Sequence, residues 1–141
     1  MHITSWNYRG LGNPKKAEAV KDLLRMEPLD ILLLQETKIS EDALLLLSKT
    51  KWKKNYGKAV SARGTPGGLE TLWSEEVFLL KESYASQHWI FTGLQHIPNK
   101  TSLALFNLYV PVNLIEKKDC WISLSQFIET HSPINNCGHG S

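Results

Sequence analysis

The sequence has few of the features that define several large classes of protein. It contains only two cysteines, Cys120 and Cys137, which excludes a disulfide framework and favours an intracellular, reducing compartment. Its longest uninterrupted aliphatic run, residues 43–47, is far shorter than the roughly 20 residues that cross a bilayer, so no membrane anchor is expected. The first residues lack the basic start and apolar core of a secretory signal. The formal charge of +2 is too small to indicate a polyanionic partner by itself.

The composition of the chain is typical of one globular domain. Of the 141 residues, 42% are hydrophobic and 21% are charged. The chain has no internal repeats and no linker rich in proline or serine, so we predict one domain without an internal boundary. Basic residues are concentrated between positions 49 and 63, with Trp52 and Tyr56 among them. Such interleaving is typical of a nucleic-acid surface, although a run of charge is more often a solvated loop.

The first 35 residues predict a strand, a helix and a second strand. Residues 3–7 have the pattern of a short strand that ends at the glycine turn of positions 10–12. Asn13 is a good N-cap for a helix that reaches Met26, and Pro14 suits its first position. Residues 30–35 contain a continuous apolar run at positions 31–34, which is typical of a strand buried on both faces. This βαβ unit predicts two parallel strands.

The rest of the chain predicts one more helix, a group of strands and a final helix. Ser40 can cap the second helix, and Asn113 with Glu116 has the spacing of a capping box for the last one. The strands are expected over residues 58–63, 68–73, 77–83, 88–97 and 101–110, as an antiparallel meander. The last helix is expected to carry its apolar side chains on one side, namely Trp121, Leu124, Phe127 and Ile128.

Two polar residues lie where the first two strands end. Asn7 closes the first strand, and Glu36 follows the second. An asparagine at a strand end is more often only a turn former. If the two strands are neighbours, however, Asn7 and Glu36 emerge at the same rim, where α/β sheets bind ligands. An amide and a carboxylate oxygen at one point suit a hard divalent cation such as Mg²⁺.

Four motifs follow one another in an order that is more specific than any one of them. They are Trp6-Asn7-x-Arg9-Gly10-Leu11-Gly12, Gln35-Glu36-Thr37-Lys38, Gly67-Gly68-Leu69 with Trp73, and Asn107-Leu108-Tyr109-Val110-Pro111. Together they resemble the motifs of the endonuclease/exonuclease/phosphatase family of magnesium-dependent phosphodiesterases. The first motif is most similar to the endonuclease domain of plant LINE-type retrotransposons. The resemblance extends from about Ile3 to Cys137.

This resemblance implies a fold and a set of roles. The fold class is α/β, with residues 1–141 as the N-terminal portion of a single domain truncated at its C-terminus. That portion is an incomplete two-layer β-sandwich flanked by helices, with mixed parallel and antiparallel strands. By the resemblance, Glu36 binds Mg²⁺ or Mn²⁺, Asn7 orients Glu36 or touches the metal, and Tyr109 faces the scissile phosphate. Asn107 is expected to be structural. The implied partner is DNA, and the nucleus is one candidate location.

The sequence departs from the family pattern in two places. Glu70 occupies a position where the pattern has a small residue, and a buried unpaired carboxylate costs several kcal/mol. The later Gly-Asp-x-Asn and Ser-Asp-His motifs are absent from the 141 residues. We therefore expect a retrotransposon-derived, magnesium-dependent DNA endonuclease-like domain that is catalytically incomplete. The alternatives are a non-catalytic remnant that binds nucleic acid through the basic segment, and an enzyme for a small phosphate ester.

Overall fold

The computed structural model of the chain describes residues 2–7, 13–26, 29–53, 56–61 and 68–131. The chain falls into two compact units, Met1–Tyr109 and Val110–Ser141. Within the described residues, no helix is long and apolar enough to cross a membrane. The glycine turn of positions 10–12 and the C-terminal ten residues lie outside the described part.

The first unit begins with the predicted βαβ arrangement. Strand β1 (Ile3–Asn7) pairs in parallel with β2 (Ile31–Gln35), and helix α1 (Pro14–Met26) connects them. Strand β4 (Leu69–Ser74) pairs antiparallel with β2 on one side and with β3 (Gly57–Ser61) on the other. The four strands form a sheet with the order β1-β2-β4-β3. The predicted parallel pair is therefore confirmed.

A second, three-stranded sheet contains β5 (Phe78–Ala85), β6 (Trp89–His96) and β7 (Ser102–Leu108), all antiparallel. The expected meander is wrong in one respect, because β3 and β4 belong to the first sheet instead of continuing into the second. All six residues of β4 are buried. A strand buried on both faces needs a central place in a sheet, and β4 has it between β2 and β3.

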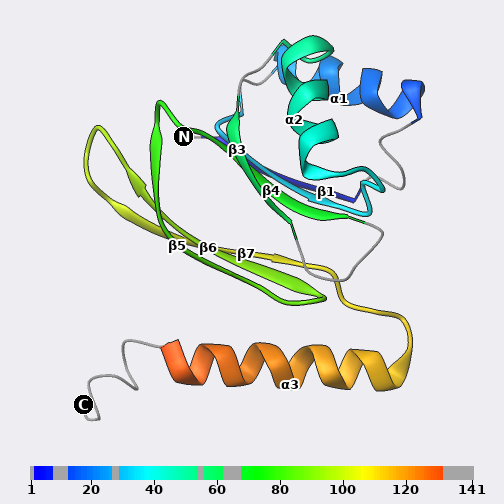
Figure 1. The fold of residues 1–141 in the computed structure, drawn as a ribbon, viewed down its shortest axis with the longest axis vertical. Helices are drawn as coiled ribbons and strands as arrows, with labels where there is room; N and C mark the ends of the chain where they lie inside the picture. The colour runs from blue at the N-terminus through cyan, green and yellow to red at the C-terminus, as the bar shows by residue number, and fades with distance from the viewer. Residues whose placement is uncertain (1, 8–12, 27–28, 54–55, 62–67, 132–141) are drawn as a thin grey trace. The chain divides into compact units, whose positions relative to one another are not determined.

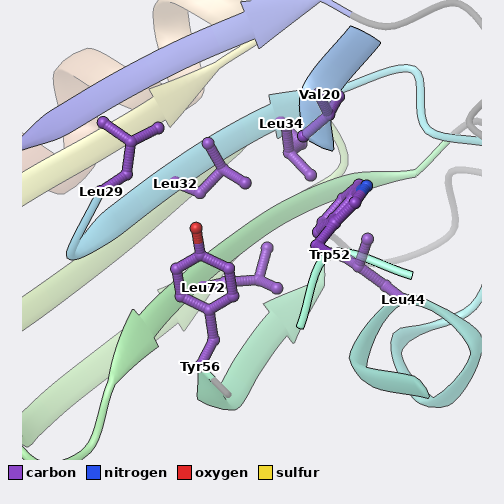
Figure 2. Close-up of a cluster of buried hydrophobic side chains, with 8 residues drawn as sticks. All are labelled: Val20, Leu29, Leu32, Leu34, Leu44, Trp52, Tyr56 and Leu72. Atoms are coloured by element: carbon purple, nitrogen blue, oxygen red, sulfur yellow. The ribbon is translucent and has the colours of Figure 1, made fainter. Parts of the chain in front are cut away.

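Helices α1 and α2 (Glu41–Thr50) lie on one face of the first sheet (Figure 1). Each helix begins at its predicted cap. The side chain of Asn13 accepts the Lys15 N–H at 2.9 Å, and that of Ser40 accepts the Ala43 N–H at 3.1 Å. Figure 2 shows the cluster between helices and sheet, which we call the helix-side core. Its members are Val20, Leu29, Leu32, Leu34, Leu44, Trp52, Tyr56 and Leu72.

A second core cluster lies between the two sheets. It contains Ile31, Leu33, Trp73, Phe78 and Leu94. Successive residues of β2 thus alternate between the two clusters, as expected for a strand buried on both faces. The sheets pack face to face over this cluster, with helices outside the first sheet (Figure 1). The predicted α/β sandwich with mixed strand directions is confirmed.

The aromatic residues of the basic segment belong to the core. Trp52 is 6% exposed and Tyr56 is 0% exposed, and the Trp52 indole donates a 2.9 Å hydrogen bond to the Ala17 carbonyl oxygen. Burial, and secondly the charge of Asp30, raise the pKa of the Tyr56 hydroxyl far above its usual value. The interpretation of Trp52 and Tyr56 as part of a nucleic-acid surface is therefore wrong, because neither ring can stack on a base (Figure 2).

The second unit contains α3 (Leu114–His131). As predicted, the Asn113 side chain caps it, accepting the N–H groups of Ile115 and Glu116 at 2.9 and 3.2 Å. Its buried side chains are Cys120, Leu124 and Phe127. Trp121 and Ile128, which were expected on the same side as Leu124 and Phe127, are 46% and 47% exposed. Each follows a buried residue directly, and one position turns a helix by about 100°.

Candidate active site

The structure places Asn7 and Glu36 at one end of the first sheet. Strands β1 and β2 run in parallel, and Asn7 is the register partner of Gln35. Glu36 follows Gln35 directly, so both predicted metal ligands lie where the two strands end. The Asn7 side chain is exposed and that of Glu36 is half-buried. This end of the sheet, with Asn7, Gln35, Glu36 and Thr37, is called the strand-end rim below.

Two buried amides connect the rim to the second sheet. The Gln35 side chain donates to the Asn107 Oδ1 at 2.7 Å and to the Ser5 hydroxyl at 3.1 Å. The Asn107 amide in turn donates to the backbone carbonyl oxygens of Glu70, at 2.9 Å, and Leu34, at 3.3 Å. Asn107 is 1% exposed. Its expected structural role is confirmed, because it hydrogen-bonds to the two central strands of the other sheet.

Tyr109 lies at the same end of the molecule as the rim. Asn107 contacts Gln35, the last residue of β2, and Tyr109 comes two residues after Asn107, just past the end of β7. The Tyr109 N–H donates to the His88 carbonyl oxygen at 2.9 Å, which fixes its backbone beside the start of β6. The side chain is half-buried. All three predicted site residues therefore lie at one end of the sandwich.

The backbone of the rim is unusual. Glu36 and Lys38 have φ values of 56° and 58°, in the left-handed region that residues with a side chain rarely adopt. Thr37, between them, is 0% exposed, and its N–H donates to the Gly68 carbonyl oxygen at 3.2 Å. The turn that carries Glu36 is thus attached to the segment that enters β4.

Glu70 is buried, as its position in a central strand requires. It is 1% exposed, and its Oε2 accepts a hydrogen bond from the Thr37 hydroxyl. This hydrogen bond lowers the free-energy cost of burying a carboxylate at this position. Sequence reasoning singled out Glu70 only as a departure from a pattern and assigned no role to Thr37. The available signal was a threonine beside a candidate ligand and a carboxylate in a strand with no other charged residue.

The side-chain atoms at the rim that could bind a metal ion are oxygens. A carboxylate and a carboxamide are the side chains that Mg²⁺ and Mn²⁺ accept, and Mg²⁺ usually takes only one or two protein carboxylates beside water and phosphate. Among the described residues, no group of three or more His, Cys, Asp or Glu side chains could hold a metal ion. The residues present at the rim thus fit a hard divalent cation with few protein ligands.

The comparisons with known proteins agree with this architecture. The model of the endonuclease/exonuclease/phosphatase family matches residues 4–139, and the chain belongs to that family. No curated protein matches the chain.

Several solved structures share the fold. The mannosyl-6-phosphatase of Bacteroides thetaiotaomicron is 10% identical with a TM-score of 0.70, over 94% of this chain and 61% of that one. D. rerio TDP2, solved with a single-strand DNA product, is 15% identical with a TM-score of 0.62, over 93% and 55%. The AP endonuclease of Leishmania major is 19% identical with a TM-score of 0.56, over 95% and 45%. The chain thus spans less than two thirds of the length of each.

Proposed function

We propose that this chain is part of a magnesium-dependent phosphodiesterase of the DNA endonuclease type, derived from a LINE-type retrotransposon of plants. The observation that carries the proposal is the common end of β1 and β2, where Asn7 is the register partner of Gln35, the residue directly before Glu36. Family membership supports a phosphoester-cleaving chemistry. DNA as the substrate is supported by the likeness of the first motif to the endonuclease domain of plant LINE-type retrotransposons, and a small phosphate ester is the alternative substrate.

In this proposal Glu36 donates a carboxylate oxygen to Mg²⁺ or Mn²⁺, and Asn7 either adds its amide oxygen or orients Glu36. When bound, the ion would stabilise negative charge on the phosphoryl oxygens and on the leaving oxygen. Tyr109 faces the phosphate and holds it by hydrogen bonding. The hydrogen bond between the buried side chains of Gln35 and Asn107 holds the rim close to the end of β7.

We further propose that residues 1–141 alone are catalytically incomplete. The chemistry needs an acid that aligns and deprotonates the attacking water, and the Gly-Asp-x-Asn and Ser-Asp-His motifs that would supply it are absent from this sequence. Loss of a general base removes roughly two to four orders of magnitude in rate. The chain should therefore bind the metal ion without supporting efficient cleavage.

The test combines metal binding with cleavage. We expect weak Mn²⁺ binding that is lost in Glu36→Gln and retained in Glu76→Gln, a matched change at an exposed glutamate in the turn before β5. Supercoiled plasmid and a small phosphate ester should both stay intact with Mg²⁺. Equal Mn²⁺ binding by wild type and Glu36→Gln would refute the metal site. Cleavage that disappears in Glu36→Gln would refute the incompleteness, and the substrate cleaved would identify the substrate class.

A further inference from the structure

A buried carboxylate lies directly behind the turn that carries Glu36. Glu70 lies opposite Leu34 in the register of β2 and β4. Register partners share one face of a sheet, so the Glu70 side chain lies on the face that carries the helix-side core. A carboxylate among leucines is costly unless it is hydrogen-bonded, and Glu70 meets this requirement through the Thr37 hydroxyl.

Thr37 is attached to the start of β4 at two points. Its N–H donates to the Gly68 carbonyl oxygen, and its hydroxyl donates to the Glu70 carboxylate. The space around this contact is filled. A Cβ atom added to Gly68 would overlap the Thr37 Oγ1 and would lie 3.0 Å from the Glu70 Oε1. Thr37 therefore has little freedom to move relative to β4.

Glu36 lies between two anchored residues. On one side, Gln35 is held by the hydroxyl of Ser5 and the amide of Asn107. On the other side, Thr37 is held by Glu70. A left-handed backbone at a residue such as Glu36 persists only where its surroundings hold it. The backbone of Glu36 is therefore restricted by the anchors on both sides of it.

We propose that Glu70 is a positioning residue for the metal site. By accepting the Thr37 hydroxyl, it fixes the backbone at Glu36 and directs the Glu36 carboxylate to the ion. The proposal rests on the proposed function, because it requires Glu36 to be a metal donor. We assign Glu70 no direct contact with the ion, because its side chain is buried and accepts the Thr37 hydroxyl. Loss of a group that orients a ligand in this way typically lowers metal affinity by roughly 10- to 100-fold.

The test is the Mn²⁺ affinity of the full chain, measured by electron paramagnetic resonance of the free ion. Thr37→Val keeps the shape of the side chain and removes the donor, whereas Thr37→Ser keeps the donor. We expect roughly tenfold weaker Mn²⁺ binding in Thr37→Val and a change within about threefold in Thr37→Ser. The control is Thr92→Val, because the Thr92 hydroxyl is buried without a hydrogen-bond partner in the described part of the chain. Its Mn²⁺ affinity should equal that of the wild type.

A second variant and a second measurement cover the case in which Thr37→Val does not fold. Glu70→Gln keeps the size and an acceptor oxygen but removes the charge that makes the hydrogen bond strong, so Mn²⁺ should bind about threefold more weakly. Hydrogen exchange of the Thr37 amide reports on the anchor without any metal. We expect the amide of residue 37 to exchange faster in Glu70→Gln than in the wild type, and roughly tenfold faster in Thr37→Val than in the wild type and Thr37→Ser.

The outcomes separate this proposal from the one on which it rests. Equal Mn²⁺ binding by wild type and Glu36→Gln refutes the metal site, and Thr37 amide exchange then still tests the anchor. If Glu36→Gln abolishes binding while Thr37→Val and Glu70→Gln bind Mn²⁺ as the wild type does, the positioning role of Glu70 is refuted. Unchanged exchange of the Thr37 amide in either variant refutes it as well.

Discussion

The side chains of Gln35 and Asn107, which are 72 positions apart in the sequence, are joined by a 2.7 Å hydrogen bond between the two sheets. Both residues are buried. Strand β2 ends at the first residue and β7 ends one residue after the second. This bond holds the carboxyl ends of both strands together, and the candidate site residues Glu36 and Tyr109 lie just beyond them.

Asn107→Ala should lower the free energy of unfolding by about 2–4 kcal/mol, because it leaves several buried polar groups without their partner. Those groups are the Gln35 amide, the Thr71 hydroxyl and the carbonyl oxygens of Leu34 and Glu70. Chemical denaturation measures the change. The control is Asn99→Ala, in an exposed turn where the side chain accepts only the Thr101 N–H among the described contacts. A loss at Asn107 no larger than at Asn99 would contradict the role given to this amide.

Local signals in the sequence predicted most of the elements. Asn13, Ser40 and Asn113 each cap a helix, because capping depends only on residues within one turn. The apolar run of β2 predicted a strand buried on both faces. The division of the strands into two sheets could not be predicted in this way. Whether β4 pairs with β2 or with β5 depends on contacts between distant segments, which local periodicity does not determine.

The position of Asn7 and Glu36 could be predicted from the sequence, but the contacts that hold their surroundings in place could not. Parallel strands end at the same rim, so the sequence order placed Asn7 and Glu36 together. The contact between Thr37 and Glu70 was not predictable, because it joins residues 33 positions apart. Trp52 was misinterpreted for a related reason. A tryptophan among lysines has the same local pattern whether its ring packs inward or outward.

Gly68→Ala should lower the free energy of unfolding by about 2–4 kcal/mol, because φ is +76° there and a Cβ atom would overlap the Thr37 Oγ1. The control is Gly93→Ala in β6. Its nearest neighbour would be the Glu82 Cγ at 3.1 Å, in an exposed side chain that can move, so the change should stay within about 1 kcal/mol. Thermal and chemical denaturation both measure the difference. Equal effects at the two glycines would argue against the close packing of Gly68 on Thr37.

Trp52→Ala should destabilise the chain by about 3–5 kcal/mol, since it removes a buried indole and the hydrogen bond to the Ala17 carbonyl oxygen. Trp121→Ala provides the comparison at a tryptophan that is 46% exposed, and its effect should be less than about half as large. Urea denaturation monitored by circular dichroism gives both values. If Trp52→Ala leaves stability unchanged and weakens DNA binding instead, the ring belongs to a nucleic-acid surface after all.

Stability should fall in alkaline solution because of Tyr56. Burial and the charge of Asp30 raise the pKa of its hydroxyl in the folded chain, so the fold favours the neutral phenol. The stability that this provides is fully present below the ordinary tyrosine pKa of about 10, and it declines above that pH by roughly 1.4 kcal/mol per unit while the folded hydroxyl stays protonated. In Tyr56→Phe this part of the decline should vanish.

Guanidinium denaturation at pH 9, 10 and 11 measures the decline in stability. The control is Tyr84→Phe, which removes a hydroxyl from a tyrosine that is 40% exposed. An equally steep decline in the wild type and Tyr56→Phe would mean that Tyr56 does not cause it.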